Sequence, residues 1–99
     1  MFILELTYTA PLSAVDAHLE AHVAWLDQQY EAGVVLASGR KNPRDGGVLI
    51  AVAEDRAQVE KIVAEDPFTV AEVCAYRITE FCATKTAPAL SAYREELPA

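Results

Sequence analysis

Two residues far apart in the chain, His22 and Asp66, have the side chains needed for proton transfer. A helical pattern covers about residues 13–32. At about 100° per residue, His22 falls on the apolar side of this helix with Leu26, whereas Trp25 falls outside it and is expected to be partly exposed. Asp66 stands before a proline where a second helical pattern stops, because the residue before proline disfavours the α conformation. If both helices cover one face of a sheet, the carboxylate can meet the imidazole.

This pair permits two interpretations. A histidine on an apolar helix face is often a structural residue that bonds to a carboxylate, because buried polar groups need partners. Alternatively, Asp66 orients the imidazole and His22 acts as a general acid or base. The residues alone leave both interpretations open.

The stretch HLEAH contains two histidines, His18 and His22, at helical spacing. The zinc protease pattern H-E-x-x-H places glutamate directly after the first histidine, whereas Glu20 comes two residues after His18. No third ligand accompanies the two imidazoles. We therefore expect neither a metal site nor a bound cofactor.

The segment ASGRK, residues 37–41, ends a predicted strand and carries Ser38 and Arg40. Ser38 lacks the G-x-S-x-G context of a nucleophile, so we expect it to donate a hydrogen bond near a pocket or to stabilise a turn. Arg40 belongs to a small basic cluster with Lys41 and Arg44, which forms either a solvated hairpin or an anion-binding site. Ser38 and Arg40 are thus the candidate substrate-binding residues.

Hydrophobic periodicity predicts four strands and two helices in the order β-α-β-β-α-β. The strands are expected over residues 2–8, 34–40, 48–53 and 73–82, and the helices over residues 13–32 and 55–65. Gly33 suits the end of the first helix, and Asp55 suits the N-cap of the second. A turn-rich connection covers residues 41–47, and a last short helix is expected around residues 90–96.

This order predicts an α+β, ferredoxin-like fold with a four-stranded antiparallel sheet. Residues 1–83 form the domain and residues 84–99 a C-terminal tail. The helices should cover one face of the sheet, which leaves a mixed face with Ile3, Glu5 and Arg77 in need of cover. A homodimer that encloses this face is expected.

Composition excludes several classes of protein. The net charge of −7 argues against binding to nucleic acid or to an anionic membrane. The start of the chain has no signal-peptide pattern, and no apolar run is long enough for a membrane span, so a cytoplasmic protein is expected. Cys74 and Cys82 fall on one predicted strand about 26 Å apart, which is too far for a disulfide.

Together, HVAWLDQQYEAGVVLASGR and the later DPF resemble the YciI-like family, also called the YCII-related domain, over nearly the whole domain. The resemblance implies a ferredoxin-like domain that pairs into a dimeric α/β barrel. It also implies a His–Asp dyad, which His22 and Asp66 match, and a serine before glycine, which Ser38 matches. Many members continue S-G-P, whereas this chain has Arg40.

The resemblance leaves two hypotheses about function. The first is a cofactor-independent enzyme of lyase or isomerase type, in which the dyad transfers a proton on a small, often aromatic, compound. The second is a non-catalytic small-molecule-binding or accessory dimer, in which the same dyad is a structural pair. In both, the expected partners are a small-molecule ligand and a second copy of the chain.

Overall fold

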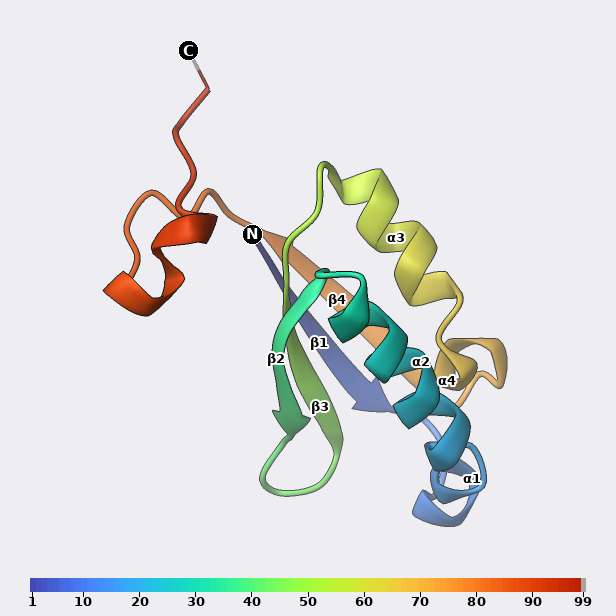
Figure 1. Ribbon diagram of the computed structural model, residues 1–99. Coiled ribbons are helices and arrows are strands. Elements are labelled where there is room, and N and C mark those ends of the chain that lie inside the picture. Colours follow the sequence, from blue (N-terminus) through green and yellow to red (C-terminus); the bar gives the residue numbers. More distant parts are fainter. Residues whose placement is uncertain (99) are drawn as a thin grey trace.

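A four-stranded antiparallel sheet carries its helices on one face in the computed structural model, which describes residues 1–98 (Figure 1). The elements in chain order are β1 (Phe2–Tyr8), α1 (Leu12–Asp16), α2 (Leu19–Glu31), β2 (Val35–Arg40), β3 (Gly46–Ala51), α3 (Arg56–Ala64), α4 (Pro67–Val70), β4 (Cys74–Glu80) and the 3₁₀ helix η1 (Pro88–Tyr93). The strands lie in the order β2-β3-β1-β4. The predicted ferredoxin-like α+β fold is confirmed.

Alternation along β1 separates the two faces of the sheet. Phe2, Leu4 and Leu6 are each 2% exposed and pack beneath the helices, whereas Glu5 and Thr7 point to the other face. One core cluster joins the Phe2 end of β1 to α2 and α3. A second cluster joins Leu6 to Val15 and Phe68, which lie on α1 and α4. The second cluster surrounds the predicted dyad.

The first helical region is two helices, where the periodicity predicted one over residues 13–32. The chain leaves helical geometry at His18, whose φ and ψ angles are −113° and 5°. This break changes the phase of the helical wheel, because angles counted from residues before the break do not apply after it. As a result Trp25, predicted to be partly exposed, is buried in the first core cluster at 6% exposure. His22 is also buried, as predicted.

The second helical region ends and restarts around Pro67. Asp55 caps α3 as predicted, because its side chain accepts a hydrogen bond from the backbone N–H of Gln58. Pro67 stops the second helical pattern and is also the first residue of a short helix, α4. Proline suits that position, because the first helical residue needs no intrahelical N–H donor and proline fixes a suitable φ. Asp66 is therefore the N-cap of α4.

The hairpin between β2 and β3 brings backbone very close to β1. A Cβ atom built on Gly46 would lie 1.8 Å from the backbone oxygen of Leu6, so no larger residue fits there. At the end of α2, Gly33 has a φ of 76°, the left-handed conformation expected of a glycine that terminates a helix. These two glycines fix where β2 begins and where β3 meets the sheet.

The C-terminal tail lies apart from the helices, beyond the end of β4 (Figure 1). Its short helix is η1, a 3₁₀ helix that begins two residues before the predicted start. Cys82 follows β4, and both it and Cys74 are free cysteines. None of the helices in the described chain is both long enough and apolar enough to span a membrane.

Candidate active site

Asp66 is the polar centre of the second core cluster, and its carboxylate is fully buried. One oxygen, Oδ1, accepts hydrogen bonds from the Phe68 backbone N–H at 2.9 Å and lies 2.8 Å from the His22 Nδ1 atom. The other oxygen, Oδ2, accepts a hydrogen bond from the Tyr76 hydroxyl. Three elements, α2, α4 and β4, thus contribute one partner each. The carboxylate has the partners that burial of a charge requires.

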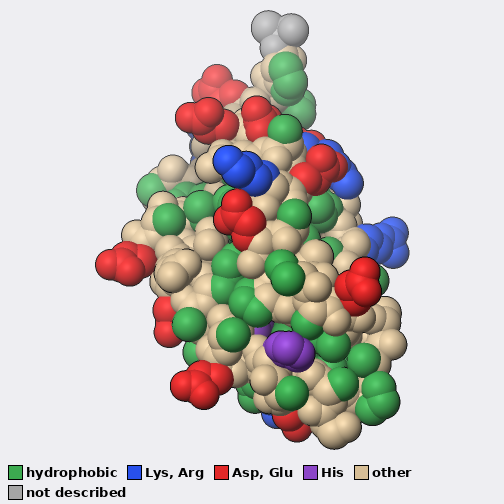
Figure 2. All heavy atoms as spheres, turned by 90° about the vertical axis from the view of Figure 1, so that its right-hand side faces the viewer, with side chains coloured by type: hydrophobic (Ala, Val, Ile, Leu, Met, Phe, Trp, Pro, Cys, Tyr) green, Lys and Arg blue, Asp and Glu red, His purple; other side chains and the backbone are tan. Residues whose placement is uncertain are grey.

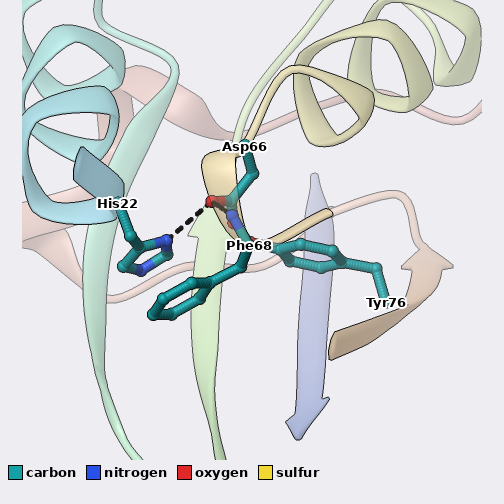
Figure 3. Close-up of polar contacts among 4 residues, drawn as sticks. All are labelled: His22, Asp66, Phe68 and Tyr76. Atoms are coloured by element: carbon teal, nitrogen blue, oxygen red, sulfur yellow. Dashed lines mark hydrogen bonds and ion pairs between the residues drawn. The ribbon is translucent and has the colours of Figure 1, made fainter. Parts of the chain in front are cut away.

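These contacts determine which nitrogen of His22 carries a proton in the neutral imidazole. Asp66 accepts from two other donors, and an ionised carboxylate can only accept, so Nδ1 must donate to it. The remaining nitrogen, Nε2, is then unprotonated and available as a base. In Figure 3 this second nitrogen lies on the side of the ring away from Asp66. His22 and Asp66 therefore have the arrangement of a base and its orienting carboxylate.

Contacts with two aromatic rings also restrain the orientation of the imidazole. The Phe68 ring stacks on the His22 ring with centroids 4.0 Å apart and planes 6° apart. Trp25, one turn further along α2, lies 5.6 Å from it between ring centroids. Phe68 also has a backbone N–H that bonds to Asp66, so its position fixes both members of the pair. His22 has little freedom to rotate away from the carboxylate.

A cavity of about 220 Å³ opens beside the imidazole. Most of its wall is hydrophobic, with residues from β1, α2 and β3, and glycines of the hairpin form part of it. The lining residues are Leu6, Tyr8, Leu19, His22, Val23, Leu26, Ser38, Gly39, Arg40, Gly46, Gly47, Leu49 and Phe68. Many hydrophobic side chains reach the surface on the helical side of the molecule (Figure 2). His22 thus borders a cavity and is not sealed within the core.

Ser38 and Arg40 line the same cavity as His22, although they were predicted from a different part of the sequence. The Ser38 hydroxyl lies 2.5 Å from the Tyr30 hydroxyl, which connects β2 to the end of α2. Ser38 therefore has a partner already, and within residues 1–98 its hydroxyl bonds to no base that would activate it as a nucleophile. The structure brings three of the four candidate site residues, His22, Ser38 and Arg40, to one cavity. The fourth, Asp66, does not line the cavity but is in direct contact with His22.

No group of three or more His, Cys, Asp or Glu side chains within residues 1–98 is arranged to hold a metal ion. His18, the other histidine of HLEAH, lies at the N-cap of α2, where its side chain makes no capping bond. Because the chain breaks before α2, His18 lies at the N-cap of this helix and His22 lies near its start.

Two partners of the pair, Tyr76 and Phe68, were not predicted. Tyr76 shares the inner face of β4 with Cys74 and Ile78, and its register partner on β1 is Leu6. The alternation of side chains along β4 could have predicted that Tyr76 points toward the helices. The stacking of Phe68 on His22 depends on α4, a helix of four residues that no periodicity reveals.

Burial raises the pKa of Tyr76 far above its usual value, and the charge of Asp66 and their hydrogen bond add to this shift. The folded chain therefore retains the phenol proton at pH values where the unfolded chain loses it. The resulting stability is present below pH 10, the usual pKa, and is lost as the pH rises above it.

Tyr76→Phe is expected to lower the free energy of unfolding by about 1.5–3 kcal/mol at pH 7, because Asp66 loses a charge-assisted hydrogen bond. Above pH 10, wild-type stability should fall by about 1.4 kcal/mol per pH unit relative to this variant. Urea unfolding at several pH values measures both effects. Tyr30→Phe removes a hydroxyl from an exposed contact and should change stability by less than about 0.5 kcal/mol. Equal effects of the two substitutions would contradict the prediction.

Comparison with known proteins agrees with the fold. The chain resembles 5-chloro-2-hydroxyhydroquinone dehydrochlorinase from Burkholderia phenoliruptrix AC1100, solved in complex with 2,5-dihydroxybenzoquinone. The TM-score is 0.67 at 24% identity, over 82% of this chain and 93% of the other. No curated protein sequence matches. The model of the YCII-related domain matches residues 1–82. This match covers the sheet, helices α1 to α4 and every candidate site residue, and the chain therefore belongs to the YCII-related domain family.

Proposed function

We propose that the protein is a cofactor-independent enzyme that transfers a proton on a small organic compound, with His22 as the acid–base group and Asp66 as its orienting carboxylate. One observation carries the proposal: the imidazole lies 2.8 Å from a buried carboxylate and at the same time lines a cavity of about 220 Å³. A structural histidine needs the first contact but has no need of the second.

In the proposed step, Nε2 of the neutral imidazole accepts a proton from a C–H or O–H group of the substrate. The resulting imidazolium is stabilised by the Asp66 carboxylate, which also accepts hydrogen bonds from the Phe68 N–H and the Tyr76 hydroxyl. The imidazolium then returns the proton to another atom of the substrate or to a leaving group. Return to carbon gives an isomerisation, and departure of a group gives an elimination.

The cavity supports a small, largely apolar substrate. Leu6, Leu26 and Leu49 line it, while Ser38 and Arg40 of β2 supply polar groups. The structurally similar dehydrochlorinase acts on a chlorinated hydroxyhydroquinone, and its structure contains a dihydroxybenzoquinone. Hydroxylated aromatic compounds are therefore the first substrates to test on this chain.

The test is a screen in D₂O followed by NMR. The protein is incubated with 5-chloro-2-hydroxyhydroquinone and related chlorinated and hydroxylated aromatic compounds, and loss of C–H signals and formation of products are recorded. We expect exchange or conversion of at least one compound that binds. Binding of several compounds with neither exchange nor conversion would contradict an acid–base enzyme.

The second candidate function is a small-molecule-binding or accessory protein in which the pair is structural. The observation that favours it is the full set of partners around Asp66, which caps α4 and bonds to Tyr76 besides His22. On this interpretation the carboxylate connects three elements, and the cavity binds a ligand without changing it.

In either case we propose that two copies of the chain pair through the sheet face that carries no helix. Ile3, Val48 and Ile50 are only partly buried on that face, and Glu5 lies opposite Arg77 in the register of β1 and β4. A mixed apolar surface of this kind is typical of an interface.

The dimer predicts a sedimentation mass twice the 10.8 kDa of the chain at micromolar concentration. Ile50→Arg should give a monomer, because a charge at the centre of the interface would lose its water without gaining a partner. Val70→Arg is the matched control, since Val70 is 71% exposed on α4 and its substitution should leave the dimer intact. A monomeric wild-type protein would refute the proposal.

A further inference from the structure

Three cations lie at the end of β2 and in the hairpin that follows it, and two of them are paired. Lys41 Nζ lies 3.7 Å from a carboxylate oxygen of Glu5 and 3.5 Å from one of Asp45. The Arg44 guanidinium lies 2.5 Å from an Asp16 carboxylate oxygen. Among residues 1–98, no ion pair or hydrogen bond involves the side chain of the third cation, Arg40.

Arg40 is also the member of this group that lines the cavity beside His22. The charge of Arg40 does act on one carboxylate, that of Asp16. The pKa of Asp16 is lowered mainly by its hydrogen bond from Arg44, and the charge of Arg40 makes the smallest contribution. Asp16 is thus already engaged by Arg44, and it does not line the cavity. The guanidinium of Arg40 keeps its donors free.

The rest of the cavity wall contains no compensating negative charge. Its lining residues are hydrophobic side chains, aromatic rings, glycines, Ser38 and the imidazole, with no Asp or Glu among them. Asp66 lies behind His22 and directs both oxygens to other donors. A ligand in the cavity therefore meets both the imidazole and one positive charge.

We propose that the cavity selects a small anionic compound, whose carboxylate or phenolate group binds the Arg40 guanidinium while His22 faces the rest of the molecule. This inference rests on the proposed function, because it assigns a substrate class to the same cavity. Arg40 acts as a specificity-determining residue, and His22 remains the group that moves the proton.

The selection is local, because the protein as a whole repels anions. Its net charge of −7 disfavours the approach of an anion at long range, an effect that salt screens beyond about 8–10 Å. At contact, a guanidinium can donate two parallel N–H bonds to a carboxylate. A partly enclosed hydrophobic wall reduces competition from water for these bonds.

The experiment measures binding by titration calorimetry with two pairs of compounds of matched shape. One pair is 2,5-dihydroxybenzoquinone, an anion at neutral pH, and neutral 2,5-dimethoxybenzoquinone; the other is benzoate and benzamide. The wild-type protein should bind at least one anion about 10- to 100-fold more tightly than its neutral partner. Arg40→Gln should reduce that preference to less than about threefold.

Lys41→Gln is the matched control, because it removes the same charge from the adjacent residue, which is already paired with carboxylates. It should leave the preference unchanged. The proposal is overturned if Arg40→Gln keeps the preference, if Lys41→Gln loses it equally, or if the wild type prefers neither anion. His22→Asn separates the two proposals: it should lower turnover by about 10²- to 10⁴-fold while the preference for the anion persists. Retained turnover in this variant would refute the acid–base role alone.

Discussion

His22→Asn is expected to lower turnover of the natural substrate by about 10²- to 10⁴-fold, the usual contribution of a positioned general acid–base group. Asparagine suits this test because its amide nitrogen occupies nearly the position of Nδ1 and can still donate to Asp66. What disappears is Nε2, the atom proposed to accept the proton. The free energy of unfolding should fall by less than about 2 kcal/mol, since the hydrogen bond is kept and only the stacking on Phe68 is lost.

Steady-state rates and thermal melts of the same preparations give the two results together. His18→Asn is the matched control, because it makes the same change four residues earlier, where the side chain does not touch Asp66. It should retain wild-type turnover. If His22→Asn turns over like the wild type and only His22→Ala melts early, His22 is a structural residue and the binding or accessory function is favoured.

The second large effect is expected for Asp66→Ala, which should lower the free energy of unfolding by about 3–5 kcal/mol. The substitution leaves three donors without their acceptor in the core: Nδ1 of His22, the Phe68 N–H and the Tyr76 hydroxyl. A domain of this size has a total stability of about 5–15 kcal/mol, so the variant is expected to be close to unfolding. Urea unfolding followed by circular dichroism measures the loss.

Asp55→Ala provides an internal comparison for Asp66→Ala. Both aspartates are N-caps that accept a bond from a backbone N–H, but the bond of Asp55 is exposed. Loss of an exposed cap costs about 1 kcal/mol. The difference between the two variants therefore measures the contribution of burial and of the His22 and Tyr76 contacts. A difference near zero would show that these contacts do not stabilise the fold.

The pairing of His22 with Asp66 could be predicted because it depends on coarse features of the sequence. The histidine lies on an apolar helix face, the aspartate follows the second helix, and a β-α-β-β-α-β order puts both helices on one side of the sheet. Errors of a few residues in the bounds of each element do not change this outcome. The same reasoning explains why the fold was predicted correctly.

Features that depend on local backbone geometry could not be predicted in this way. The predicted exposure of Trp25 was wrong because a helical wheel assumes one continuous helix, whereas the chain breaks at His18. The prediction for Pro67 was incomplete because proline can both end one helix and begin the next. Only packing against the core decides that α4 forms. Tyr76 was missed because its contact with Asp66 requires the exact register of β4 on β1.

The place of Tyr76 on the last strand has a consequence for how the chain matures. His22, Asp66 and Phe68 all precede β4, yet Asp66 gains its third donor only when β4 pairs along the edge of β1. Such pairing between the two ends of the domain forms late, because the intervening loop must close first. A nascent or truncated chain that ends before Cys74 therefore lacks a properly held carboxylate. If His22 acts as the proposed acid–base group, such a chain is expected to be inactive until β4 has paired with β1.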